Sequence, residues 1–154
     1  MRSRERVLTV VVSASEGSDM KNVLLAYDGS DGAKRALDAV AALHHEGDDV
    51  TIVSSAEGLP LFGYAGTLPS LEQEEERHRQ AVEAQIALSE HGIEATVVER
   101  HGDPAAAILD EADKEGADLI VMGTRGLSTA ERWLLGSVST KVLHHAHCSV
   151  LVAR

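Results

Sequence analysis

Glycine and serine recur between residues 123 and 137 in a spacing that suits a phosphate-binding loop. Gly123 and Gly126 stand three residues apart, and Gly136-Ser137 follows after a spacer of nine residues. Glycine lets main-chain N–H groups approach a ligand closely, and a helix beginning at Gly136-Ser137 would present unpaired N–H groups to an anion. The spacing matches neither GxxxxGK[ST] nor GxGxxG. By itself it leaves two interpretations open, a phosphate cradle or a turn followed by a helix cap.

Oxygen-bearing side chains occur where such a ligand would need them. Asp28 directly follows an apolar segment, and its carboxylate could accept a hydrogen bond from a ribose hydroxyl or bind Mg²⁺ carried by the phosphates. Ser137 and Ser139 would add hydroxyl donors to phosphate oxygens. Arg125, inside the loop, is a candidate phosphate contact, with a solvent-facing side chain as the alternative.

The elements that must position these residues alternate along the chain. Five apolar runs predict strands, at residues 23–26, 50–53, 95–98, 119–122 and 149–152. Helical spacing of apolar residues, with glycine or proline at the ends, predicts helices over 33–43, 71–91, 103–116 and after 136. Continuous apolar strands that alternate with helices indicate an α/β fold, an open parallel five-stranded sheet with helices on both faces.

The predicted strand order, 3-2-1-4-5, depends on strands 23–26 and 119–122 being neighbours. Ligands of open α/β sheets bind beyond the carboxyl ends of the strands, where the winding direction reverses. In this order Asp28 and the glycine loop meet over one crevice.

The domain is predicted to span residues 20–154, after a leader at residues 1–19. Three arginines precede the apolar run Val7–Val12, which resembles a signal peptide but is shorter than the usual ~7–15 apolar residues. We therefore expect a flexible leader or an extra edge strand. Met20 also has the appearance of a natural start.

Composition disfavours several classes of protein. With 14 basic and 25 acidic residues the net charge is −11, which opposes binding to nucleic acid or anionic membranes. No apolar run reaches the roughly 18 residues that span a bilayer. The single cysteine, Cys148, excludes an internal disulfide and predicts a cytoplasmic protein. His144 to Cys148 carries metal-binding residue types, but no second cluster completes a ligand set, so a surface corner is favoured.

From residue 20 to 154 the sequence resembles the universal stress protein family. Its nucleotide-binding members carry Gly-2x-Gly-9x-Gly-Ser/Thr, which Gly123, Gly126, Gly136 and Ser137 match position for position. The resemblance implies a Rossmann-like domain of the adenine nucleotide alpha hydrolase type that binds ATP, with or without Mg²⁺ at Asp28. The expected site residues are Ala26, Tyr27, Asp28, Ser55, Met122, Gly123, Arg125, Gly126, Gly136, Ser137, Val138 and Ser139. The second strand departs from the family, since Val53-Ser54-Ser55 stands where Leu-His-Val is common.

The expected function is that of a nucleotide-dependent regulatory protein in the stress response. No catalytic motif is present, so at most weak ATP hydrolysis is expected. The alternatives are a slow Mg²⁺-dependent ATPase or phosphotransferase, and a dimeric interaction module without nucleotide.

A homodimer is expected through strand 149–152. In the predicted order this strand lies at an edge of the sheet, is apolar on both faces and carries no lysine or proline. Such an edge invites another strand, and a two-fold partner would pair the same strand antiparallel. The family resemblance implies the same arrangement.

Overall fold

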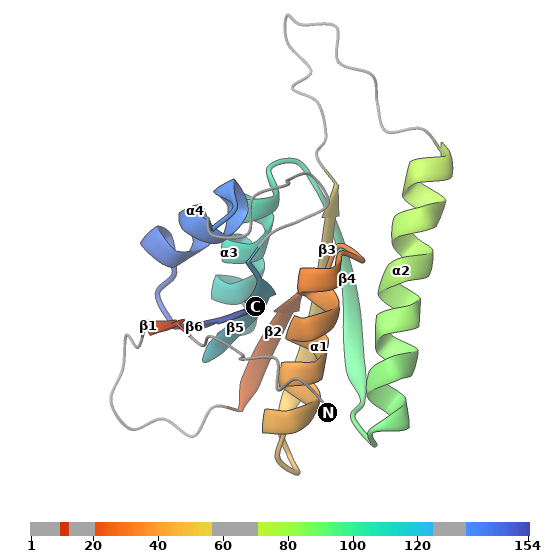
Figure 1. Cartoon of the computed structure of the whole chain (residues 1–154), viewed down its shortest axis with the longest axis horizontal. Helices are drawn as coiled ribbons and strands as arrows, with labels where there is room; N and C mark the ends of the chain where they lie inside the picture. The colour runs from red at the N-terminus through yellow and green to blue at the C-terminus, as the bar shows by residue number, and fades with distance from the viewer. Residues whose placement is uncertain (1–9, 13–20, 57–70, 125–134) are drawn as a thin grey trace, which may run out of the picture.

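The computed structural model describes residues 10–12, 21–56, 71–124 and 135–154, which form one six-stranded sheet and four helices. The strands are β1 (Val10–Val12), β2 (Asn22–Ala26), β3 (Asp49–Ala56), β4 (Ala95–His101), β5 (Leu119–Gly123) and β6 (Ser149–Ala153). The helices are α1 (Asp31–Leu43), α2 (Leu71–Glu90), α3 (Pro104–Glu115) and α4 (Ser137–His145). Figure 1 shows the sheet from β1 and β6 on one side to β3 and β4 on the other, in the order β1-β6-β5-β2-β3-β4.

Strands β2 to β6 are parallel and confirm the predicted order 3-2-1-4-5, which becomes β4-β3-β2-β5-β6. Their side chains alternate between two cores. Leu25 and Val121 pack on the face covered by α1 and α2, whereas Leu24 and Ile120 pack on the face covered by α3 and α4. Because both of their faces are buried, β2, β5 and β6 read as largely continuous apolar runs. In β4, at the edge of the sheet, no residue is buried.

The helices begin where their sequences provide caps. Ser30 caps α1 by accepting a hydrogen bond from the Ala33 N–H at 3.1 Å. Asp103 caps α3 by accepting from the Ala106 N–H at 3.0 Å. Such side-chain caps typically stabilise a helix by about 1 kcal/mol. None of the described helices is long and apolar enough to cross a membrane.

The expectation that strand 149–152 is a free edge is wrong within this chain. Strand β1 pairs antiparallel with β6, and Val10, Val11 and Val12 lie opposite Val152, Leu151 and Val150. The three valines have high β-propensity and supply the partner strand that an apolar edge requires. This pairing covers residues 150–152, on the edge where the homodimer is expected, and the homodimer itself stays a prediction.

A carboxylate ties the amino ends of the two central strands together. Asp118, just before β5, accepts hydrogen bonds on Oδ2 from the N–H groups of Lys21 and Asn22, at 3.1 and 3.0 Å. The Asp118 N–H in turn donates to the Asn22 carbonyl at 2.8 Å. These bonds hold β2 and β5 in register from the end opposite the glycine loop.

A buried carboxylate joins α3 to β4. The Glu111 side chain on α3 is 1% exposed and forms ion pairs with Arg100 on β4 and with Lys114, whose Nζ lies 3.1 Å from Oε1. Burial alone would raise the pKa of Glu111. The hydrogen bonds and positive charges of Lys114 and Arg100 outweigh that effect and hold the pKa below its ordinary value.

This pKa shift predicts how the Glu111 contribution to stability depends on pH. A carboxyl group whose pKa is lowered by folding stabilises the folded state above its unfolded pKa of about 4.3, and the stabilisation is lost as pH falls through the folded pKa. We expect Glu111→Gln to lower the free energy of unfolding by about 1–2 kcal/mol at pH 7. Urea unfolding from pH 7 to pH 3 should show this difference disappearing in acid. A difference that is equally large at pH 3 would contradict a charge-based role.

Candidate functional site

The residues predicted to hold a ligand converge at the carboxyl ends of β2 and β5. These strands are adjacent, with Val23, Leu24 and Leu25 opposite Leu119, Ile120 and Val121. The chain winds from β2 to β3 and β4 on one side, and from β5 to β6 on the other. The prediction that the two strands are neighbours is therefore confirmed, and the winding direction reverses between them, where open α/β sheets bind ligands.

The end of β5 lies against the first turn of α1. A Cβ atom placed on Gly123 would lie 2.5 Å from the carbonyl carbon of Gly32 and 2.8 Å from its Cα and oxygen. Real Cβ atoms essentially never make backbone contacts this short, so only glycine fits at residue 123. Helix packing alone thus requires the first glycine of the motif, whatever ligand the loop holds.

Hydrogen bonds hold the two described ends of the glycine loop side by side. The Thr124 carbonyl accepts from the Gly136 N–H at 2.7 Å and from the Ser139 hydroxyl at 3.0 Å. The Thr124 N–H donates to the Ala153 carbonyl of β6 at 3.1 Å. The start of α4 is therefore fixed beside the end of β5. Arg125 and Gly126 lie outside the described residues.

Ser139 is placed differently from Ser137. The Ser139 side chain is buried, and its hydroxyl also lies 3.0 Å from the Gly136 carbonyl. Its single proton is therefore used within the loop. Ser137 is exposed at the first position of α4, and Val138 packs half-buried on the α3/α4 core.

The N-terminus of α4 differs from those of α1 and α3 because no side chain caps it. Its cap residue is Gly136, in extended backbone conformation with φ −66° and ψ 166°. Among the described residues, no cap side chain engages the N–H groups of the first turn, as a serine or aspartate would. Together with the positive end of the helix dipole, they form a surface suited to an anion.

At the end of β2 the side chains of Tyr27 and Ala26 pack into the two cores of the domain. The Tyr27 N–H donates to the Val53 carbonyl at 2.9 Å, and the Tyr27 ring is buried in the α1/α2 core. Burial, followed by the charges of nearby carboxylates, raises the pKa of the Tyr27 phenol. Ala26 is half-buried on the opposite core. Ala26 can therefore offer a small apolar surface, whereas the Tyr27 N–H is already engaged between β2 and β3.

Asp28 shapes the turn into α1. Its Oδ1 accepts from the Ser30 N–H at 3.0 Å, while Gly29 adopts a left-handed conformation with φ +76°. The carboxylate is half-buried at the carboxyl edge of the sheet. This hydrogen bond fixes the position of the side chain relative to the end of β2.

The remaining predicted residues lie on the neighbouring strand ends. Ser55 is half-buried near the end of β3, and Met122 is buried at the end of β5 in the α3/α4 core. Sequence interpretation missed Thr124, whose two backbone groups anchor the loop. A threonine directly after a strand carries no pattern that would identify this role.

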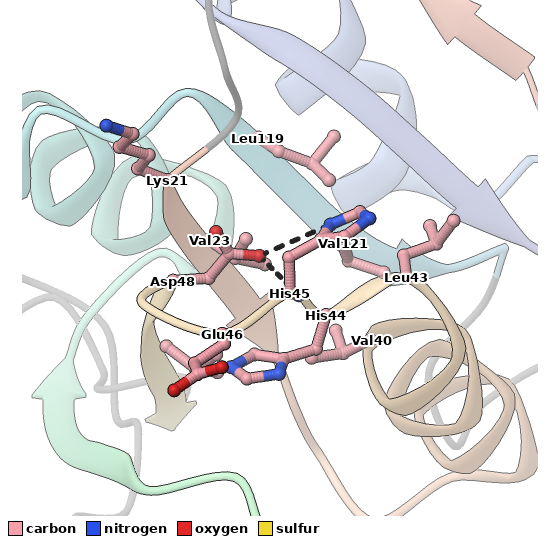
Figure 2. A pocket seen from close by; sticks show the side chains of 11 residues that line it. Lys21, Val23, Val40, Leu43, His44, His45, Glu46, Asp48, Leu119 and Val121 are labelled. Atoms are coloured by element: carbon pink, nitrogen blue, oxygen red, sulfur yellow. Dashed lines mark hydrogen bonds and ion pairs between the residues drawn. The ribbon is translucent and has the colours of Figure 1, made fainter.

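A cavity of about 520 Å³ lies at the other end of the sheet. Figure 2 shows the end of α1 and the amino ends of the strands around it, with dashed lines between Asp48 and His45. The Asp48 carboxylate accepts from the His45 N–H at 2.7 Å. The walls are mixed, with apolar residues such as Val40 and Leu119 and polar residues that include Lys21 and the two histidines. None of the predicted ligand residues lines this cavity.

The histidine-rich segment ends α4. His144 and His145 place their Nδ1 atoms 2.8 Å from the carbonyl oxygens of Thr140 and Lys141, one turn earlier. Burial is the main cause of the raised pKa of the Cys148 thiol. Within the described part of the chain, no group of three or more His, Cys, Asp or Glu residues could hold a metal ion.

Sequence comparison links this arrangement to one family. The profile of the Universal stress protein family matches residues 20–154. A protein of Thermus aquaticus, described as a universal stress protein in the QAH/OAS sulfhydrylase 3′ region, is 41% identical over 136 residues, which cover 87% of this chain and 98% of that protein.

Solved structures of universal stress proteins share the fold. The Archaeoglobus fulgidus protein in complex with dAMP has a TM-score of 0.69 and 27% identity, covering 88% of this chain and 98% of that one. A universal stress protein in complex with cAMP has a TM-score of 0.67 and 26% identity, covering 88% and 97% of the two chains. Two solved relatives of this chain were therefore determined with adenine nucleotides.

Proposed function

This chain belongs to the universal stress protein family, and from that premise we propose that it binds an adenine nucleotide between the ends of β2 and β5 and the start of α4. The observation that carries the proposal is the uncapped N-terminus of α4, which Thr124 fixes beside Gly123 at the point where the sheet reverses its winding. The dAMP and cAMP complexes of the two relatives support it.

The site residues divide by chemistry. The base would lie against the ends of β2 and β3, where Ala26, Tyr27 and Ser55 offer main-chain groups and little bulk. The ribose would meet Asp28, which a Mg²⁺ ion carried by the phosphates could also use. The phosphates would accept hydrogen bonds from the first turn of α4, including the Ser137 hydroxyl.

We expect ATP to act as a ligand that regulates a cytoplasmic stress-response protein. Titration calorimetry with ATP, AMP and GTP, each with and without Mg²⁺, tests this. Adenine nucleotides should bind, and GTP should bind at least about tenfold more weakly, because main-chain groups at a strand end distinguish the base edges. Absence of binding by ATP, AMP and cAMP would contradict the proposal.

Placing a carboxylate at the start of α4 should separate ligand binding from folding. Aspartate is favourable in the first turn of a helix, so Ser137→Asp should fold at least as stably as the natural chain. The same charge would repel a bound triphosphate, and we expect ATP affinity to fall at least about tenfold, roughly 1.4 kcal/mol.

Ser137→Asn is the matched control, since asparagine has the size of aspartate without the charge. It should lose less than about threefold in affinity. Equal losses in the two variants would indicate a steric effect and would argue against phosphate at this helix end.

A further inference from the structure

The cavity at the amino ends of the strands has the size and the lining of a small-molecule site. Its volume of about 520 Å³ lies within the range of ligand pockets, roughly 300–1,000 Å³. Leu43, at the end of α1, is 48% exposed and also lines the cavity, so a ligand would cover apolar surface that now faces solvent. The other apolar residues of the lining are buried: Val23, Val40, Val50, Leu119 and Val121.

An enclosed carboxylate lies among these apolar side chains. The Asp48 side chain lines the cavity and is only 10% exposed. Its Oδ2 accepts a hydrogen bond from the His45 N–H at 2.7 Å. In the described part of the chain, no lysine or arginine forms an ion pair with Asp48, and its nearest basic group is the His45 ring, with Nδ1 at 3.8 Å. A carboxylate so far withdrawn from water favours a bound cation.

The other charges around the cavity also favour a cation. Helix α1 carries no basic residue in its last turn, so no such charge offsets the negative end of its dipole there. Glu46 adds a second carboxylate to the wall, and His44 and His45 complete its polar part with Lys21. Figure 2 shows the Lys21 amine pointing away from Asp48. A cation with an apolar body would match both the charge and the lining.

We propose that this cavity binds a small amphipathic amine, an aryl- or alkylammonium ion. The ammonium group would donate hydrogen bonds to the Asp48 carboxylate beside the end of α1, and the apolar part would lie against Val40 and Leu119. The cavity is at the end of β2 and β5 opposite to the glycine loop. The inference therefore does not depend on nucleotide binding.

NMR spectra of the full chain with labelled methyl groups test the proposal. 2-Phenylethylamine should shift the methyl signals of Val40, Leu43 and Leu119 and should saturate, with a dissociation constant on the order of 1 mM or tighter for a ligand of this size. 2-Phenylethanol has nearly the same shape without the charge and should bind at least about tenfold more weakly. 3-Phenylpropanoate, an anion with the same ring, should give no saturable shift.

Two variants test the role of Asp48. Asp48→Asn removes the charge but keeps the size of the side chain and an oxygen that can accept from the His45 N–H. It should weaken binding of 2-phenylethylamine at least about tenfold. Glu46→Gln is the matched control, since Glu46 is exposed, and should lose less than about threefold. Thermal unfolding checks that both variants fold, and the comparison of amine with alcohol holds in the natural chain even if they do not.

Several results would overturn the proposal. They are the absence of a saturable shift at about 10 mM amine, an alcohol or carboxylate that binds as tightly as the amine, and a folded Asp48→Asn variant with unchanged affinity. Shifts confined to the surroundings of Asp28 and Ser137 would place the amine at the other end of the sheet and would equally contradict it.

Discussion

Gly123→Ala is expected to destabilise the protein by about 3 kcal/mol, at the upper end of the range for overpacked sites. The added Cβ would lie 2.5 Å from the Gly32 carbonyl carbon, and the atom it meets belongs to backbone rather than to a flexible side chain. Either the first turn of α1 or the end of β5 must move. Thermal unfolding should show a melting temperature lower by about 6–12 °C.

Gly92→Ala is the matched control for this substitution. Gly92 has φ +76°, and nothing lies within 4 Å of the Cβ position. The change should lower stability by about 1 kcal/mol, through backbone strain alone. If Gly123→Ala loses no more than Gly92→Ala, the close approach of α1 to β5 is not the reason for glycine at residue 123.

Arg100→Met is the second substitution with a large expected effect, a loss of about 2–3 kcal/mol. Methionine keeps the apolar part of the side chain but leaves the buried Glu111 carboxylate with Lys114 as its remaining partner. Removing one partner of a buried ion pair is strongly destabilising because a charge stays in a dry environment. Urea unfolding at pH 7 measures the difference.

Lys114→Met should lower stability less than Arg100→Met. The Lys114 side chain is 61% exposed, against 39% for Arg100, and solvent screens the more exposed partner more effectively. The double variant Arg100→Met/Glu111→Leu should recover part of the stability lost in Arg100→Met, because no buried charge remains. A double variant less stable than Arg100→Met would contradict this account of the ion pairs.

The fold was predictable because two patterns agreed along the chain. The apolar runs at 23–26 and 119–122 are uniform, those at 50–53 and 95–98 are each interrupted by one threonine, and helical patterns separate all four. In β2, for example, Leu24 and Leu25 pack in opposite cores. Leucine is favourable at both positions only because helices cover both faces of the sheet. The strand order followed from placing Asp28 and the glycine loop over one crevice.

The roles of individual site residues were less predictable. Spacing located Gly123 and Gly136, but it did not show that Gly123 packs against Gly32. Nor did it show that the Ser139 hydroxyl donates into the loop while Ser137 is exposed. These roles depend on contacts between segments far apart in the sequence, and local spacing carries no information about them.

The edge of the sheet was misjudged for the same reason. The apolar strand at 149–152 and the valine-rich run at 7–12 are both evident in the sequence, but neither segment's own residues indicate that the two pair. Their register appears only in three dimensions, where Val11 lies opposite Leu151.

The pairing of β1 with β6 has a consequence for the order in which the protein is made. Val10–Val12 is translated first among the strands and Ser149–Ala153 last, with almost the whole chain between them. At about 5–20 residues per second, a ribosome needs on the order of ten seconds to pass from one to the other. During that interval the valine segment has emerged without its partner, while β2 and β3 can already pair. The sheet therefore gains its outermost strand only after Ser149–Ala153 has been made, and the nascent chain carries an unpaired apolar segment until then.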